Sequence, residues 1–319
     1  MTETADRPLV TFALFAYNQE QYIREAIEGA FAQTYEPLEI ILSDDCSTDR
    51  TFEIMQEMAA AYEGPHEVRV RRNRQNLGLA AHLNAVVEIA GGEILVLAAG
   101  DDISLPDRTE ASFECLRRNP AVTAVLLSAN VINEAGRTVG ERLSGKSKVG
   151  GGLQTLSDLL AWRHTTFGAT RAVRRDVLTR FGPLNATCPT EDTPLLLRSL
   201  LCGPNALSHH KAVLYRRHEN NLSGLASLRR MNTDEIYSQH RSDINLAVQM
   251  ELIPHRMATK LEKWITLDHE IRRLRLKIAS EEVKNFKDTM LAVQHPATSL
   301  REKAKLLATY FASLSDAHK

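Results

Sequence analysis

The chain has 319 residues, of which 43% are hydrophobic and 25% are charged, and its formal net charge is −1. This is the composition of an ordinary globular protein, and the charge balance argues against a general nucleic-acid binder. The cysteines lie far apart without a CxxC pair, which argues against a zinc ribbon or disulfide framework and fits a reducing compartment; they are Cys46, Cys115, Cys188 and Cys202.

The first hundred residues alternate between strand-like and helix-like segments. Residues 8–17 are apolar with β-branched and aromatic members, which indicates a buried strand, and residues 18–33 carry apolar side chains at helical spacing. Strands that alternate with helices predict βαβ units and a mostly parallel sheet, so we expect an α/β fold. The pattern continues with strands at 38–42, 66–73 and 93–100 and helices at 51–62 and 76–92.

Polar side chains follow three of these predicted strands. Ligands bind beyond the carboxyl ends of the strands in a parallel sheet, so we expect these side chains to meet at one edge. The pairs are Tyr17-Asn18, Asp44-Asp45 and Asp101-Asp102.

The second part of the chain is less regular. It predicts a strand at 121–133, a mobile glycine- and lysine-containing loop at 136–152, a short helix at 153–163 and a strand with a helix at 165–185. A helix from Thr190 and a strand with its exit loop at 206–224 follow. Long charged helices begin after about residue 225, so we expect a main domain over 1–225 and a helical region over 226–319.

The segment VLAAGDDISLPDR ends a buried-looking strand in two adjacent carboxylates, Asp101 and Asp102. Like charges repel, and each carboxylate loses hydration near a core, so a helix N-terminus, a cation or water must compensate them. A solvated turn or helix cap is the simpler alternative, because Ser104 and Pro106 are ordinary turn residues.

Five segments in order resemble glycosyltransferase family 2, a family of inverting sugar transferases with the GT-A fold. They cover roughly residues 8–224. The resemblance implies a GT-A catalytic domain over 1–225 that transfers a sugar from a nucleoside-diphosphate donor, UDP-linked, to a hydroxyl of a glycan or glycolipid by direct displacement. The segments are FAYNQEQYIREAIEGAFAQTYEPLEIILSDDCSTDRT, NLGLAAHLNAVVEIAGGEILVLAAGDD, FGATRAVRRDVLTRFGPLN, TED and YRRHENNLS.

The resemblance assigns Asp102 and His218 to a divalent cation, Mn²⁺ or Mg²⁺, and Asp101 to the ribose or the sugar. Such a cation absorbs the negative charge that develops on a departing diphosphate. The family often has a further acid two residues before the pair, where this chain has Ala99. A lone histidine is more often a satisfied structural residue, which is the alternative for His218.

The resemblance also indicates how the nucleotide is bound. Asp45 matches the acid that accepts a hydrogen bond from the base imide, which favours uracil or thymine. Tyr17 is expected to stack on the base, with a core aromatic role as the alternative. Phe15 lies where the family contacts the base through its backbone. Glu20 is a candidate for ribose or loop contacts, and Asn76 matches the loop beneath the nucleotide.

The TED segment supplies the expected catalytic base. Direct displacement requires a group that takes the proton of the acceptor hydroxyl, and the resemblance gives that role to Asp192. Glu191 is expected to orient Asp192, bind the acceptor, or place favourable negative charge in the first turn of the following helix. Arg216 and Arg217 are candidates for a phosphate clamp, or solvated charges at a strand end.

Two other functions stay open from the sequence. A nucleotidyltransferase shares the α/β layout but would show a glycine-rich loop after the first strand, and LFAYNQEQY contains no glycine. A non-catalytic nucleotide-sugar-binding or scaffold subunit is the second alternative. Release of free nucleotide during turnover would separate an enzyme from such a binder.

The last third carries apolar residues at helical spacing among basic ones. We expect self-association or peripheral membrane contact through these helices, and the alternative is a helical cap packed on its own catalytic domain. The polar N-terminal segment and the absence of a membrane-length apolar run favour a cytoplasmic protein, with the inner face of the cell membrane as the peripheral location. The stripe comprises Trp264, Ile265, Leu267, Ile271, Leu274 and Ile278.

Overall fold

The structure is a computed structural model that divides into two compact units. The first unit comprises Met1–Leu159 and His164–His218, and the second comprises Leu160–Arg163 and Glu219–Lys319. The boundary expected near residue 225 lies within 222–230, outside the described residues. The structure describes residues 7–145, 151–219, 221, 231–280, 285–298 and 300–316.

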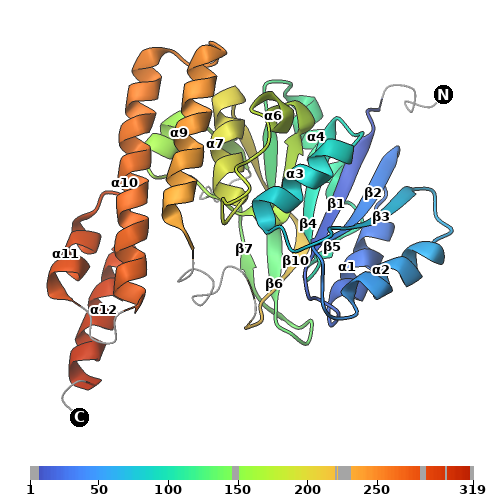
Figure 1. The fold of residues 1–319 in the computed structure, drawn as a ribbon, viewed down its shortest axis with the longest axis horizontal. Coiled ribbons are helices and arrows are strands. Elements are labelled where there is room, and N and C mark those ends of the chain that lie inside the picture. The colour runs from blue at the N-terminus through green and yellow to red at the C-terminus, as the bar shows by residue number, and fades with distance from the viewer. Residues whose placement is uncertain are drawn as a thin grey trace. The chain divides into compact units, whose positions relative to one another are not determined.

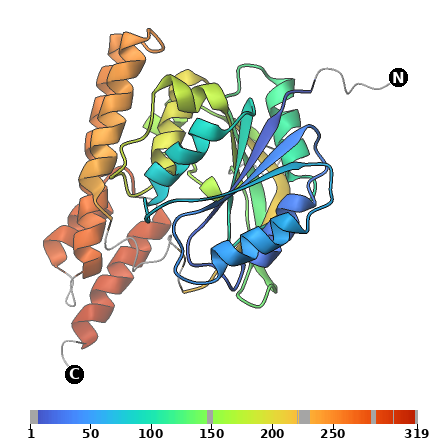
Figure 2. The same cartoon turned by 45° about the vertical axis from the view of Figure 1, so that its right-hand side comes forward.

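The first unit begins with the alternating strands and helices that the sequence predicts (Figure 1). These are β1 (Val10–Ala16), α1 (Ile23–Phe31), β2 (Leu38–Asp44), α2 (Thr51–Ala60), β3 (Glu67–Arg72), α3 (Leu79–Ile89) and β4 (Ile94–Ala99). Helices α2 and α3 lie on opposite sides of the parallel strands, so both faces of this part of the sheet are covered (Figure 2).

The remaining elements of the first unit extend the sheet and add helices. They are β5 (Ile103–Ser104), α4 (Arg108–Arg118), β6 (Ala124–Ile132), β7 (Thr138–Arg142), β8 (Gly152–Gln154), α5 (Leu156–Leu160), the 3₁₀ turn η2 (Gly168–Thr170), β9 (Arg171–Arg174), α6 (Arg175–Arg180), α7 (Asp192–Cys202) and β10 (Asn205–Arg216).

The described strands form a ten-stranded sheet with the order β3-β2-β1-β4-β9-β6-β10-β5, in which β7 pairs with β6 and β8 pairs with β10. Strands β3, β2, β1 and β4 are parallel neighbours, and β6 is parallel to β10. β9 is antiparallel to both β4 and β6. Consequently β1, β2, β4, β6 and β10 end at one edge of the sheet, and β9 begins there.

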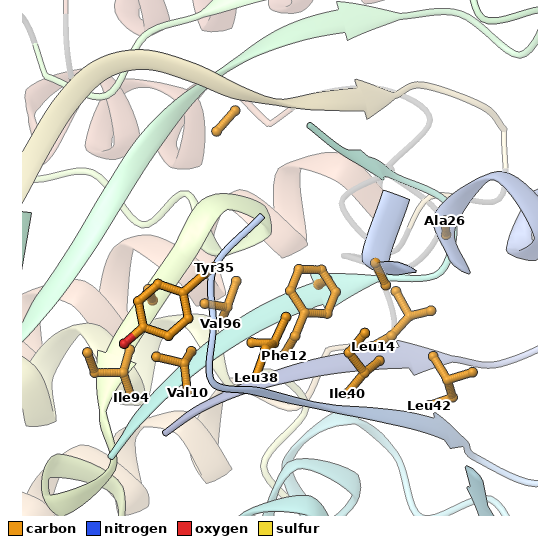
Figure 3. Packing of buried hydrophobic residues seen from close by; sticks show 14 of the residues in the cluster. Val10, Phe12, Leu14, Ala26, Tyr35, Leu38, Ile40, Leu42, Ile94 and Val96 are labelled. Atoms are coloured by element: carbon orange, nitrogen blue, oxygen red, sulfur yellow. The ribbon is translucent and has the colours of Figure 1, made fainter. Parts of the chain in front are cut away.

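The core of this unit lies between the parallel strands and their helices. Alternate residues of β1, β2 and β4 direct apolar side chains to the same side of the sheet, where Tyr35 packs with them (Figure 3). Complete burial of one such side chain contributes about 1.5–3 kcal/mol. This packing holds the strand ends in fixed positions relative to one another. The strand residues are Val10, Phe12, Leu14, Leu38, Ile40, Leu42, Ile94 and Val96.

The loop prediction for residues 136–152 was wrong in part. Thr138–Arg142 forms β7 and Gly152–Gln154 forms β8, each antiparallel to its partner strand. All five residues of β7 are exposed, so the strand needs no alternating apolar side chains and leaves no periodic signal in the sequence. Residues 146–150 lie outside the described residues.

The second unit contains α9 (Thr233–Gln249), α10 (His255–Ser280), α11 (Phe286–Gln294) and α12 (Leu300–Asp316). The Trp264 ring lies 5.2 Å from that of Trp162 within the same unit. Ile271 and Ile278 form an apolar cluster with Ala292, against which Leu274 packs. Most of the apolar stripe on α10 is therefore used in packing within this unit. Self-association, membrane contact and packing on the catalytic domain stay predictions. Among the described residues, no helix is both long and apolar enough to cross a bilayer.

Candidate active site

The polar ends of β1, β2 and β4 meet at one edge of the sheet, as the alternating pattern predicts. The backbone N–H of Asp45 donates to the Ala16 carbonyl over 2.9 Å. The backbone N–H of Gly100 donates to the Phe15 carbonyl over 2.8 Å. The loops that leave the three strands are thus joined directly. We call the edge formed by residues 15–18, 44–47 and 99–102 the acidic edge.

Asp102 is buried at the acidic edge, with an exposed fraction of 3%. Its Oδ1 accepts a hydrogen bond from the backbone N–H of Arg216 over 2.8 Å. Its Oδ2 is buried and has no hydrogen-bond partner among the described residues. Burial, and after it the charge of Asp101, raise the pKa of the Asp102 carboxyl well above its usual range. The negative form of this side chain therefore requires a nearby positive charge.

His218 lies beside Asp101. Its Nε2 is 2.9 Å from Oδ2 of Asp101, and the histidine ring packs against Tyr22 with the ring centres 4.9 Å apart. The structure thus brings His218 beside Asp101 and Asp102, although more than a hundred residues separate the histidine from the two acids in the sequence.

Arg216 supports this cluster from within the protein. Its buried guanidinium donates to the backbone carbonyls of Asp101 and Glu134, each over 3.0 Å, and pairs with the Glu25 carboxylate at 2.8 Å. The guanidinium carbon also lies 4.8 Å from the centre of the Tyr22 ring. Arg216, predicted as a phosphate clamp or a solvated charge at a strand end, is instead buried, with donors directed to the Asp101 and Glu134 carbonyls and to Glu25.

The cluster of Asp101, Asp102 and His218 fits a divalent cation that is coordinated mainly by the phosphate oxygens of a bound nucleotide. Among the described residues, no group of three or more His, Cys, Asp or Glu side chains is arranged as a complete metal site. The unpartnered Oδ2 of Asp102 offers one hard oxygen ligand. One carboxylate together with phosphate oxygens and water is the usual coordination of Mg²⁺ in phosphate-containing sites.

Asp45 holds the loop that precedes α3. Its Oδ1 accepts hydrogen bonds from Asn73 Nδ2 over 2.6 Å and from the backbone N–H of Leu77 over 2.8 Å. Its Oδ2 accepts one from the N–H of Gly78 over 2.9 Å, which leaves that oxygen a second acceptor direction. Gly78 has a φ of +76°, a conformation that favours glycine. Asn76 Oδ1 accepts from the same N–H over 3.1 Å, so Asn76 belongs to this loop.

The other residues expected near the nucleotide lie at the end of β1 and in the loop that follows it. Tyr17 is 45% exposed directly after β1. The Phe15 ring meets His82 edge to face, with the ring centres 5.1 Å apart. Burial lowers the pKa of His82 to about 4, so this ring is neutral at physiological pH. Glu20 accepts a hydrogen bond from the Arg50 N–H over 2.9 Å, which ties the α1 loop to the start of α2.

Glu191 and Asp192, which we call the acid pair, lie at the start of α7, where Glu191 is the N-cap residue. Burial, and after it the charge of Asp192, raise the pKa of Glu191 to about 8. Burial also raises the pKa of Asp192, against the opposing charge of Arg171 and hydrogen bonds from the Gly168 N–H and from Glu191. A carboxyl with a pKa of about 8 is mostly protonated at neutral pH, so Glu191 is an unusually weak acid in this site.

Gly168 positions the acid pair at the edge where β9 begins. A side chain at Gly168 would collide with the Asp192 carboxylate, so the absence of one allows the close approach. The next residue, Ala169, accepts a hydrogen bond from buried Arg108 over 2.9 Å. Arg108 also donates to the β4 carbonyl of Leu97 over 2.5 Å. The acid pair and the end of β4 are thus connected through one buried guanidinium.

Comparison with known proteins identifies the family of this chain. Residues 11–181 match the sequence profile of glycosyl transferase family 2. The chain belongs to glycosyl transferase family 2. An uncharacterized protein from Mycobacterium tuberculosis is 30% identical over 317 residues, which cover 94% of this chain and 88% of the relative. An uncharacterized glycosyltransferase from Haemophilus influenzae is 36% identical over 118 residues, 37% of this chain and 36% of the relative. As a member of this family, the protein is a glycosyltransferase.

Solved structures show the same fold. The S. aureus TarS fragment 1–349 in complex with UDP-GlcNAc has a TM-score of 0.63 at 16% identity, over 97% of this chain and 91% of the other. The mannosyltransferase PcManGT from Pyrobaculum calidifontis, in complex with GDP-Man and Mn²⁺, has a TM-score of 0.54 at 17% identity, over 98% of this chain and 88% of the other. The GT-A fold expected for this glycosyltransferase is confirmed.

Proposed function

We propose that this glycosyltransferase moves a sugar from a UDP-linked donor to a hydroxyl of a glycan or glycolipid, with inversion at the anomeric carbon. The observation that carries the proposal is the pairing of two different acidic groups in one unit. One group, around Asp102, has an unpartnered buried oxygen suited to a cation. The other, the acid pair, places two carboxyl groups with raised pKa values side by side at the start of α7.

The donor is proposed to lie along the acidic edge. The second acceptor direction of Asp45 Oδ2 suits the imide N–H of uracil, and the exposed ring of Tyr17 offers a stacking surface. Asp101 would accept a hydrogen bond from the ribose or the sugar. The fold shared with TarS, which was solved with UDP-GlcNAc, supports a UDP-linked donor.

Mn²⁺ or Mg²⁺ is proposed to bind at Asp102, with His218 beside it. The cation would offset the negative charge that develops on the departing diphosphate. PcManGT shares the fold and was solved with Mn²⁺. The raised pKa of Asp102 agrees with this proposal, because a carboxylate in that environment gains stability when a cation is bound.

Asp192 is proposed to take the proton of the attacking hydroxyl. It retains partial exposure, so an acceptor hydroxyl can reach it, and the charge of Arg171 favours its ionised form. Glu191, whose pKa burial raises to about 8, is proposed to orient Asp192 through its protonated carboxyl. In-line attack opposite the diphosphate inverts the anomeric centre. The proposed acceptor is an oligosaccharide or a lipid-linked glycan of polysaccharide biosynthesis.

The test is release of UDP from UDP-sugars with glycan acceptors, in parallel with donor binding measured by calorimetry. Asp192→Asn should bind UDP as the wild type does and transfer sugar about 10²-fold more slowly or worse, the usual scale for loss of a general base. Glu191→Gln should retain more activity. If Glu191→Gln is inactive while Asp192→Asn transfers at the wild-type rate, the two roles are reversed.

A non-catalytic nucleotide-sugar-binding subunit is the second candidate. The missing acid at Ala99 favours it, because a weaker cation site suits binding without turnover. The acid pair speaks against it, since binding alone does not require a proton acceptor. Affinity for UDP-sugars without UDP release, across a panel of acceptors, would support the subunit and contradict the enzyme.

A further inference from the structure

Arg108 is the first residue of α4 and is fully buried in the first unit. Burial lowers the pKa of Arg108 to about 10, which leaves its guanidinium positively charged at neutral pH. Gln33 fixes this end of the helix, because its Oε1 accepts hydrogen bonds from the N–H of Thr109 over 3.0 Å and from the Thr109 hydroxyl over 2.7 Å. The side chain of Arg108 therefore extends from a firmly held point in the core.

The guanidinium of Arg108 donates hydrogen bonds to three different elements. Its Nη1 donates to Ser104 Oγ on β5 over 2.9 Å. Its Nη2 donates to the Leu97 carbonyl on β4 over 2.5 Å and to the Ala169 carbonyl on η2 over 2.9 Å. Hydrogen bonds from a charged donor are stronger than those between neutral groups, so they hold these acceptors in defined positions.

These acceptors lie beside the two acidic groups of the proposed site. Ser104 comes two residues after Asp102 in the chain. Ala169 follows Gly168, and a methyl group added to Gly168 would lie 1.5 Å from Oδ1 of Asp192. One guanidinium thus joins the segment that carries the proposed cation ligand to the segment on which the proposed base packs.

We propose that Arg108 is a positioning residue that sets the separation between the cation ligand Asp102 and the base Asp192. The inference rests on the function proposed for these two acids. Direct displacement requires the base and the departing diphosphate on opposite sides of the anomeric carbon, and a misplacement of about 1 Å can slow such a reaction about 10²-fold. Because Arg108 is fully buried, it acts through the two segments and not on the substrate.

Arg174 offers a matched control at the opposite edge of the sheet. It is the last residue of β9 and lies opposite Ile94, the first residue of β4. Its Nε donates to the Val122 carbonyl over 2.8 Å, and its Nη2 donates to the Leu116 carbonyl of α4 over 3.0 Å. Arg174 therefore also joins α4 to the segment 168–174, but away from both acidic groups. Its loss should lower stability alone.

The main measurement is the rate of sugar transfer per UDP-binding site, with the sites counted by calorimetry in the presence of Mn²⁺. Arg108→Met should bind UDP near wild type but transfer sugar about tenfold more slowly per site or worse. Arg174→Met should match the wild type per site, because a loss of stability removes sites without slowing those that remain. Arg108→Lys replaces two donor nitrogens by one, should be slowed less than Arg108→Met, and carries the test if Arg108→Met does not fold. Wild-type rates per site in the Arg108 variants that fold would overturn the proposal, as would an equal loss in Arg174→Met.

Amide hydrogen exchange of residues 167–171 tests the same positioning without turnover. Release of the Ala169 carbonyl in the Arg108 variants should raise exchange in this segment about tenfold relative to that of residues 10–16, since local opening becomes easier. Arg174→Met should leave this ratio unchanged. Raised exchange would support the connection even if Asp192→Asn transfers at the wild-type rate and the base lies elsewhere. Unchanged exchange in the Arg108 variants would overturn it whichever residue is the base.

Discussion

Glu191 carries a proton at physiological pH because its surroundings, rather than its chemistry, decide its charge. Its pKa rises from 4.5 to about 8, so the folded state binds more protons than the unfolded state between these values. The contribution of Glu191 to stability is therefore present at low pH and is lost as the pH rises through this range.

This charge state predicts a measurable pH dependence of stability. The free energy of unfolding of the wild type should fall between about pH 5 and about pH 8 relative to that of Glu191→Gln. The difference should reach about 1 kcal/mol or more, since one pKa unit corresponds to about 1.4 kcal/mol. Urea denaturation at several pH values measures it, and parallel curves for the two proteins would show that Glu191 is ionised throughout.

Asp102 allows a second prediction at this scale. Asp102→Asn keeps the acceptor for the Arg216 N–H but removes the negative charge. The rise in melting temperature that UDP produces in the presence of Mn²⁺ should shrink to the rise seen without Mn²⁺, because a ligand stabilises only to the extent that it binds the folded state. Asp107→Asn, an exposed acid outside the cluster, is the control. Full Mn²⁺-dependent stabilisation in Asp102→Asn would remove this residue from the cation site.

Single residues show where sequence reasoning reaches its limit. Asp101, Asp102 and His218 were recognisable, because acids after buried strands and a matching late motif point to the same edge. Arg171 was missed, because the segment RAVRR gives no sign of which arginine is buried. Only the tertiary position of β9 between β4 and β6 buries this side chain. The burial of Arg216 was also not predicted, because the segment YRR gives no sign that its first arginine is buried.

At the scale of elements, η2 determines where the acid pair sits. Its first residue, Gly168, packs directly on the Asp192 carboxylate. Gly168→Ala should therefore displace Asp192 and lower the sugar transfer rate about tenfold or more, because small misplacements of a reacting group are costly. UDP affinity should remain near wild type. Gly140→Ala, at a position where an added methyl meets open space, is the control. Wild-type turnover by Gly168→Ala would show that the close contact is dispensable.

The elements also differ in how well the sequence predicts them. Strands β1, β2 and β4 were predictable, because burial on both faces demands continuous apolar residues. Strands β7 and β8 were not, since they lie outside the apolar core and are held by backbone hydrogen bonds to β6 and β10. The helices of the first hundred residues follow from apolar spacing, whereas the inverted direction of β9 has no local signature.

At the scale of the whole molecule, every residue that we assign to donor or acceptor chemistry lies in the first unit. The second unit has its own packed helices, in which Trp264 is 3% exposed. Trp264→Ala should destabilise that unit by about 3–5 kcal/mol, the usual cost of truncating a buried tryptophan. UDP affinity at low temperature, measured by calorimetry, should not change. Loss of UDP affinity in Trp264→Ala would show that the second unit contributes to the donor site.

The inverted direction of β9 has a consequence for how the chain tolerates insertions. The segments that follow β1, β2 and β4 lie at the acidic edge. Because β9 runs in the opposite direction, the segment that precedes β9 lies at that edge. Extra residues between Phe167 and Arg171 should therefore shift the groups that hold Asp192, as extra residues after Ala99 should shift Asp101. Lengthening at Gly91-Gly92, before β4 and at the opposite edge of the sheet, should leave both acidic groups in place. Length variation among functional variants of this chain is thus expected on the side of the sheet away from the acids.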